Sequence, residues 1–292
     1  MTGDTAGWKR RAFPIALLLG AAAICFLVLW GGQHLALLVL SRLATDPPNA
    51  PLDETIASAI VFGLLLAAGV GGGALCGVNS LRPGPRAGLM LAQGGAIGLV
   101  GLLVATALAA VAGVLHRTNG GTSAGLFVWG TALIMLQAGS EEVFFRGWLQ
   151  PLLVRNWGVA GIVATAIAFA GLHVIGGARS GVTLLNLFLG GLLFGLLAAR
   201  FQGIAAAVAA HFSWNWAEQL VFGLDPNPGN GSFGSILNLE LVGSRWWGGS
   251  DQGLNSSVAM SFALAILLAP LLILPARTAG LPGPYRSDRA PA

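Results

Sequence analysis

The residues best suited to chemistry are concentrated in one stretch, Gln137-Ala-Gly-Ser-Glu-Glu-Val-Phe-Phe-Arg-Gly-Trp148. Residues 55–224 contain only three acidic side chains, and two of them, Glu141 and Glu142, are adjacent in this stretch. Residues four apart share one face of a helix, so Glu142 should pair with Arg146 in the favourable order, acid before base. Glu141 points about 100° away around the helix and has no counter-charge nearby. We therefore predict one structural ion pair and one carboxylate that is available for chemistry.

The composition is that of an integral membrane protein. Apolar residues make up 55% of the chain and charged residues only 9%, with a mean hydropathy of +0.77. An ionised carboxylate in hydrocarbon costs roughly 2.5 kcal/mol or more, which marks the Glu141–Glu142 pair as a functional site. The net charge of +4 is spread over loops. It indicates membrane orientation and a lipid bilayer as surroundings, with no nucleic-acid partner.

Hydropathy predicts an all-α fold, a polytopic transmembrane helical bundle of about eight spans. The expected spans are residues 13–34, 55–79, 87–115, 124–149, 158–176, 182–200, 203–222 and 257–275. Alternate connecting segments carry ten basic residues on one side and four on the other. Because cytoplasmic loops are enriched in Lys and Arg, we expect both termini in the cytoplasm and a multi-pass protein of the plasma (cell) membrane.

The candidate residues also suggest how the chain is organised. Residues 1–115 carry none of them, and we interpret this part as accessory N-terminal transmembrane helices. Residues 116–222 would form the catalytic core. A Gly- and Asn-rich outer loop would follow at 223–256, and 257–292 would hold the last span and a disordered basic tail.

Four further polar residues lie in the spans that follow the Glu pair. His173 lies near the end of one span, and His211, Asn215 and Glu218 recur at helical spacing on one face of another. Each has a structural alternative: histidine and asparagine often form hydrogen bonds between membrane helices, and Glu218 could be a solvated or pairing residue near the outer surface. Counting residues from basic loop markers places Glu141, His173 and His211 at compatible depths, so one shared intramembrane site is possible.

This set of residues is suited to the activation of water. No Gly-x-Ser-x-Gly or His-Glu-x-x-His motif is present, so neither a serine nucleophile nor a metalloprotease helix is indicated. Glu141 could act as a general base while His173 holds the water. His211 and Asn215, one turn apart, could donate hydrogen bonds to an oxyanion. Glu141, His173 and His211 would also suit Zn²⁺. The sequence leaves open whether no cofactor or zinc is used, and slightly favours metal-independent chemistry.

Three motifs can now be compared with known families. Glu141-Glu142-x-x-x-Arg146, Phe169-x-x-x-His173 and His211-x-x-x-Asn215 resemble, in the same order, the signature motifs of the CAAX protease and bacteriocin-processing family of intramembrane endopeptidases. The resemblance implies that Glu141 and His173 activate water and that His211 and Asn215 stabilise the oxyanion. It implies supporting roles for Glu142 and Arg146.

The resemblance also implies a peptide or lipid-modified protein as substrate. The eukaryotic branch of the family removes the terminal tripeptide of prenylated proteins, but nothing in this sequence indicates a prenylated substrate. Two other kinds of protein remain as alternatives. One is a noncatalytic scaffold or peptide-binding protein of the same fold. The other is a transporter with a proton relay, which is less favoured because no inverted repeat is found.

Overall fold

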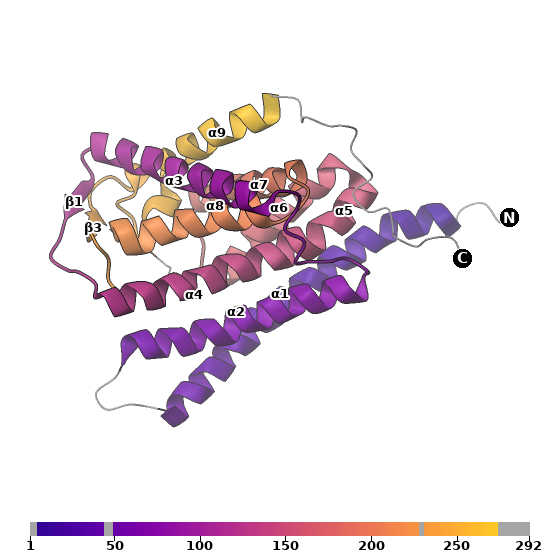
Figure 1. Cartoon of the computed structure of the whole chain (residues 1–292), viewed down its shortest axis with the longest axis horizontal. Helices are drawn as coiled ribbons and strands as arrows, with labels where there is room; N and C mark the ends of the chain where they lie inside the picture. Colours follow the sequence, from indigo (N-terminus) through magenta and orange to yellow (C-terminus); the bar gives the residue numbers. More distant parts are fainter. Residues whose placement is uncertain (1–4, 44–48, 228–230, 274–292) are drawn as a thin grey trace.

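The computed structural model describes residues 5–43, 49–227 and 231–273, and it is a bundle of helices (Figure 1). The helices are α1 (Thr5–Leu43), α2 (Ala50–Leu75), α3 (Ala87–Val111), α4 (Ala124–Glu142), η1 (Val143–Leu149), α5 (Gln150–Trp157), α6 (Val159–Ile175), α7 (Gly181–Arg200), α8 (Ala205–Trp216), η2 (Ala217–Phe222), η3 (Arg245–Trp247), η4 (Gly253–Ser256) and α9 (Val258–Ile273). The predicted all-α fold class is confirmed. The expected disordered tail after residue 273 lies outside the described residues.

Each expected span coincides with a helical segment. In α1 (Ala12–Leu43), α2, α3 and α7 the helix is long and apolar enough to cross a membrane, whereas α6 and α9 are apolar but shorter. The expected span 124–149 is one continuous helix built from α4 and η1 and prolonged by α5. The expected span 203–222 likewise combines α8 and η2.

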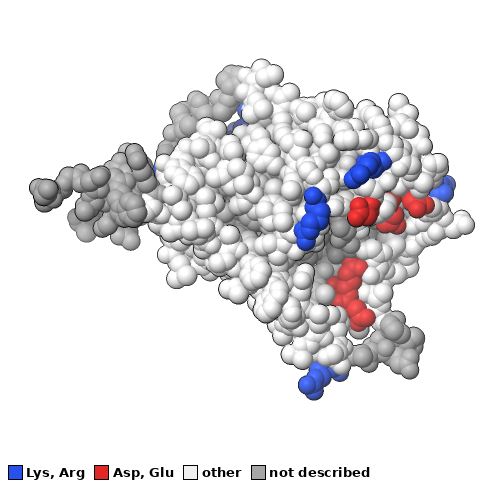
Figure 2. Space-filling view, turned by 180° about the vertical axis from the view of Figure 1, so that it is seen from behind, with Lys and Arg blue, Asp and Glu red and all other residues white. Residues whose placement is uncertain are grey.

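The surface of the bundle is largely apolar. Large hydrophobic side chains are exposed on several helices; Leu27, Trp30 and Val111 have exposed fractions of 62%, 53% and 88%. Figure 2 shows a face that is mostly free of charge, with the acidic side chains gathered toward one end. Exposed apolar surface of this extent marks contact with lipid, and the chain is a membrane protein.

Two helix starts have sequence signals that explain their positions. The side chain of Asn49 accepts a hydrogen bond from Leu52 N at 3.2 Å, and this cap starts α2. Ser123 caps α4 in the same way through Leu126 N, also at 3.2 Å. Because a side-chain oxygen at this position satisfies one of the free N–H groups of the first turn, it fixes where the helix begins. The cap at Ser123 therefore sets the start of the helix that carries the Glu pair.

Small residues bring α3 and α8 into close contact. A Cβ atom at Gly94 would collide with the carbonyl oxygen of Ala206, and one at Gly98 would collide with that of Ala210. Backbones approach this closely only where side chains are absent. The contact fixes the position of α8, and with it His211, the residue directly after Ala210.

A second close contact holds α2 against the helix of the Glu pair. A Cβ at Gly69 would lie 2.9 Å from Cα of Phe144, and one at Gly72 would overlap the ring of Trp148. Phe144 and Trp148 are buried and pack against each other edge to face, with ring centroids 5.0 Å apart. Helix α2, from the N-terminal part of the chain, thus packs directly against η1.

A small sheet lies at one end of the bundle, an arrangement that the loop composition did not predict. It consists of β1 (Leu115–Arg117), β2 (Leu224–Asp225) and β3 (Leu239–Leu241) in the order β1-β3-β2. β3 pairs antiparallel with β1 and parallel with β2. We call this end of the bundle, at which β1 and β3 lie in Figure 1, the sheet end.

The sheet has one apolar and one charged face. Leu224 and Leu241 are buried against the helices, while the register places Asp225, Glu240 and His116 in one row across the three strands. Desolvation, and to a lesser degree the neighbouring carboxylate of Glu240, raises the pKa of Asp225. Two acids directly opposite each other weaken a sheet, so repulsion between Asp225 and Glu240 should lower the stability of the protein.

Candidate active site

The helix that carries the Glu pair changes its winding directly after it. α4 ends at Glu142, and residues 143–149 form the π-helix η1 before α-helical winding resumes in α5. The helix that carries His211 and Asn215 shows the same change, because the π-helix η2 follows α8. Short π-helical turns are rare and occur frequently at functional sites. Here they lie directly after Glu142 and two residues after Asn215.

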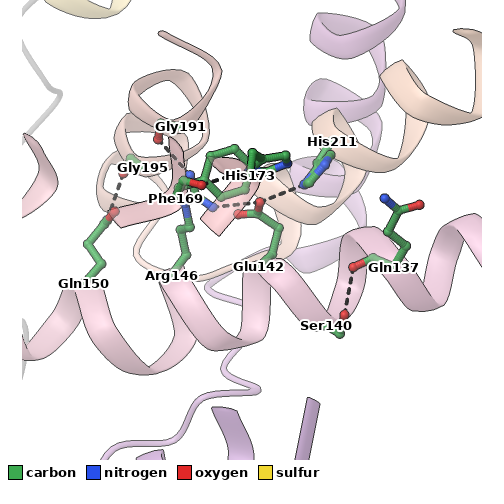
Figure 3. A network of polar contacts seen from close by, with 10 residues as sticks. All are labelled: Gln137, Ser140, Glu142, Arg146, Gln150, Phe169, His173, Gly191, Gly195 and His211. Atoms are coloured by element: carbon green, nitrogen blue, oxygen red, sulfur yellow. Dashed lines mark hydrogen bonds and ion pairs between the residues drawn. The ribbon is translucent and has the colours of Figure 1, made fainter. Parts of the chain in front are cut away.

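Glu142 connects the first and third motifs. Its Oε1 atom accepts a hydrogen bond from Arg146 at 3.0 Å and lies 2.9 Å from Nδ1 of His211, while its Oε2 atom is buried without a hydrogen bond. The side chains of Glu142 and Arg146 are fully buried. The ion pair expected from the four-residue spacing is therefore present. The contact with His211 was not anticipated, and it ties α4 to α8 (Figure 3).

Arg146 is held by a carbonyl group and by aromatic rings. One guanidinium nitrogen donates to the carbonyl of Gly191 at 2.9 Å. Cζ lies 4.5 Å from the ring centroid of Phe169 and 5.6 Å from that of Phe194, within the range of cation–π attraction. One turn further on, Gln150 donates to the carbonyl of Gly195 at 2.9 Å. Figure 3 shows the hydrogen bonds of Arg146 to Gly191 and of Gln150 to Gly195, which fasten this helix to α7.

The two histidines lie on either side of Phe169. Its ring centroid is 4.8 Å from that of His173 and 6.0 Å from that of His211. Nδ1 of His173 lies 2.9 Å from the carbonyl oxygen of Phe169. Because a carbonyl oxygen can only accept, this nitrogen carries the hydrogen, and Nε2 of a neutral His173 is left as an acceptor. His211 stacks on Phe194 with centroids 4.7 Å apart.

Other polar groups in the same region have no partner. Glu141 is 4% exposed, its Oε2 atom makes no hydrogen bond, and within the described chain it forms no ion pair. Asn215 is half-buried on α8, and its side chain makes no hydrogen bond to any described residue. The buried Oε1 of Gln137 is also unpartnered. The site therefore combines a bonded group, Glu142–Arg146–His211, with polar side chains that have unused hydrogen-bonding capacity among the described residues.

The structure brings the predicted residues together to different degrees. Glu142 is in direct contact with Arg146 and His211, and the ring of Phe169 lies against both His173 and His211. The expectation that Glu218 is solvated is wrong, because it is 4% exposed. It forms no ion pair with a described residue.

Sequence reasoning overlooked two glutamines on the same helix. Gln137 lies one turn before Glu141, and Gln150 lies one turn after Arg146. Polar residues at four-residue steps through an apolar segment form a stripe along one helix. The four-residue spacing that connects Glu142 with Arg146 also connects Gln137 with Glu141 and Arg146 with Gln150, so it could have singled out both glutamines.

The expected zinc ligands do not form a preassembled group. Among the described residues, no three His, Cys, Asp or Glu side chains are arranged to hold a metal ion. The carboxylate in contact with His211 belongs to Glu142 and not to the expected ligand Glu141. The donor set of Glu141, His173 and His211 therefore does not fit a metal as it stands, and the chemistry below uses side chains alone.

Comparison with known proteins supports the motif assignment. The family model described as type II CAAX prenyl endopeptidase Rce1-like matches residues 123–217. The matched segment begins at the Ser123 cap of α4 and ends directly after α8, so it contains all three motifs. No curated protein and no solved structure matches the chain. The family resemblance seen in the motifs is confirmed, and it supports a protease.

Proposed function

We propose that this chain, whose residues 123–217 match the Rce1-like family model, is an intramembrane endopeptidase of the CAAX protease family that activates water with its own side chains. The proposal rests on a difference in ion pairing between two adjacent buried carboxylates. Glu142 binds Arg146 and His211, whereas Glu141 is buried without an ion pair in the described chain. A buried carboxylate without an ion pair of its own is costly, and a general base is a role that accounts for it.

In the proposed reaction Glu141 takes a proton from water while the water oxygen attacks the scissile carbonyl carbon. His173 orients this water, since its Nδ1 is engaged by the carbonyl of Phe169 and its Nε2 can accept a hydrogen bond. The proton held by Glu141 then passes to the leaving nitrogen as the C–N bond breaks. The products are a new carboxyl terminus and a new amine.

The negative charge that develops on the carbonyl oxygen is stabilised from α8. Asn215 can donate a hydrogen bond from its amide, and a protonated His211 can donate from Nε2 while Nδ1 donates to Glu142. Arg146 balances the charge of Glu142 and holds it in place. Glu142 and Arg146 thus position His211 and do not touch the substrate.

The substrate class proposed from the family description is a prenylated protein with a CAAX terminus, within the broader class of peptides and lipid-modified proteins. The extensive apolar surface supports this proposal, because a lipid-modified substrate and an enzyme with such a surface would share one bilayer. We further propose a location in the plasma membrane with both termini in the cytoplasm, which follows from the distribution of basic loop residues.

The test uses purified protein in liposomes with a farnesylated peptide that ends in Cys-aliphatic-aliphatic-X. Wild-type protein should cleave it, and Glu141→Gln should reduce the rate by at least about 100-fold, the usual contribution of a general base. Glu218→Gln is the matched control, because it changes another buried glutamate outside the proposed machinery and should leave cleavage intact. Cleavage by Glu141→Gln at the wild-type rate would refute the proposal and favour a noncatalytic peptide-binding protein.

The same preparation decides whether a metal takes part. Metal-independent chemistry predicts that the cleavage rate is unchanged after chelator treatment and that elemental analysis detects no stoichiometric zinc. A rate that falls with chelation and recovers on addition of Zn²⁺ would show that Glu141, His173 and His211 rearrange into a metal site.

A further inference from the structure

Gln137 lies beside the proposed active site, and the mechanism above gives it no role. It precedes Glu141 by one helical turn on α4, and Figure 3 shows its side chain on the same side of the helix as Glu142 and His211. The residue is half-buried, and its Oε1 atom is enclosed by protein without a hydrogen bond. An enclosed amide oxygen without a partner destabilises the fold.

Two other polar side chains of the same helix are anchored by at least one hydrogen bond. Thr131, further toward the sheet end, accepts a hydrogen bond from Nε1 of Trp216 at 3.0 Å and so links α4 to α8. Gln150, beyond the Glu pair, also has a buried Oε1 without a partner, but its Nε2 donates to the carbonyl of Gly195. Gln137 differs because neither end of its amide forms a hydrogen bond to a described residue. An apolar residue at position 137 would avoid the cost of an unpartnered amide. Packing alone therefore does not account for Gln137.

We infer that Gln137 is a substrate-positioning residue whose side-chain amide binds the backbone of the bound peptide. The inference rests on the proposed peptidase function. A glutamine amide offers both a donor and an acceptor, which complements the C=O and N–H of a peptide group. The same pairing would not distinguish substrate side chains, so Gln137 fixes the alignment of the chain and not its sequence.

The geometry also indicates which peptide group is bound. Four residues of α-helix rise by about 6 Å, and an extended peptide advances roughly 3.3 Å per residue. Gln137 therefore lies about two substrate residues away from the bond that faces Glu141. Because Gln137 precedes Glu141 on α4, this peptide group lies toward the sheet end of the bundle.

The experiment combines a protein variant with modified substrates. Gln137→Met keeps the side-chain length and removes the amide, and it is assayed on farnesylated peptides that carry one N-methylated backbone nitrogen at successive positions. Wild-type protein should lose about 10-fold in kcat/KM when the nitrogen about two residues from the cleaved bond is methylated, as expected for one lost hydrogen bond. Gln137→Met should have a kcat/KM about 10-fold lower on the unmodified peptide, mainly because KM rises. Methylation at that position should not lower the kcat/KM of this variant further.

Gln150→Met is the matched control, since it removes an amide from the same helix that is bonded to Gly195. It should keep the wild-type response to methylation. If Gln137→Met responds to methylation as the wild type does, or if its kcat/KM is unchanged, the inference fails while the peptidase function stands. If Glu141→Gln is fully active, or if wild-type protein cleaves none of the peptides, the proposed function fails and the inference fails with it.

Discussion

Removing Glu142 should destabilise the protein strongly, because Arg146 would remain buried without its counter-charge. Among the described residues, the guanidinium donates to two groups, Oε1 of Glu142 at 3.0 Å and the carbonyl of Gly191 at 2.9 Å. Glu142→Ala leaves the second of these. Breaking one partner of a buried pair costs about 3–5 kcal/mol. The ring of Phe169, 4.5 Å from Cζ, retains part of the stabilisation, so we expect a loss near 3 kcal/mol.

Thermal unfolding in detergent measures this loss. For a chain of this size, 3 kcal/mol corresponds to a decrease in Tm on the order of 10 °C. The double variant Glu142→Leu with Arg146→Met is the control, because it removes both charges and keeps apolar volume. Replacing a buried pair in this way is often neutral, so the double variant should regain most of the lost stability.

Two results would refute this reasoning. A Tm of Glu142→Ala equal to that of the wild type would mean that the ion pair contributes nothing to the fold. A double variant as unstable as Glu142→Ala would mean that the loss comes from packing or from the contact with His211, and not from an unpaired charge on Arg146.

Two further predictions concern regions outside the site. Burial and Glu240 raise the pKa of Asp225, so the folded state favours the protonated acid, and the stability gained from protonation is lost as pH rises through the pKa of the folded state. Asp225→Asn should therefore raise Tm at pH 7 but not at about pH 3. An equal shift in Tm at both pH values would contradict the titration argument. Gly98→Val should lower the free energy of unfolding by about 1–3 kcal/mol, because the new side chain would meet the carbonyl of Ala210. Gly95→Val, which has no atom nearby, should unfold close to the wild-type temperature. Similar losses in both variants would mean that helix propensity, and not the close contact, causes them.

The sequence predicted local relationships well because they depend on helical spacing alone. The eight helical segments follow from apolar runs, and the Glu142–Arg146 pair follows from a separation of four residues. Contacts between helices were not predictable in the same way. The approach of His211 to Glu142 depends on the position of α8, which the glycines of α3 determine through backbone contact.

Two kinds of local structure also escaped prediction. One is the π-helical winding of η1 and η2, which no residue pattern marks. The sheet at residues 115–117, 224–225 and 239–241 is built from strands of two or three residues, too short for an alternating apolar pattern to be visible.

The most direct test of the proposed chemistry is an experimental structure of Glu141→Gln with an uncleaved farnesylated peptide bound. We predict one water between residue 141 and Nε2 of His173, within about 3 Å of both side chains. The scissile carbonyl oxygen should likewise lie within about 3 Å of the side chains of His211 and Asn215. A residue 141 side chain directed into lipid, or more than roughly 6 Å from both imidazole rings and from the scissile carbonyl, would contradict water activation by this site.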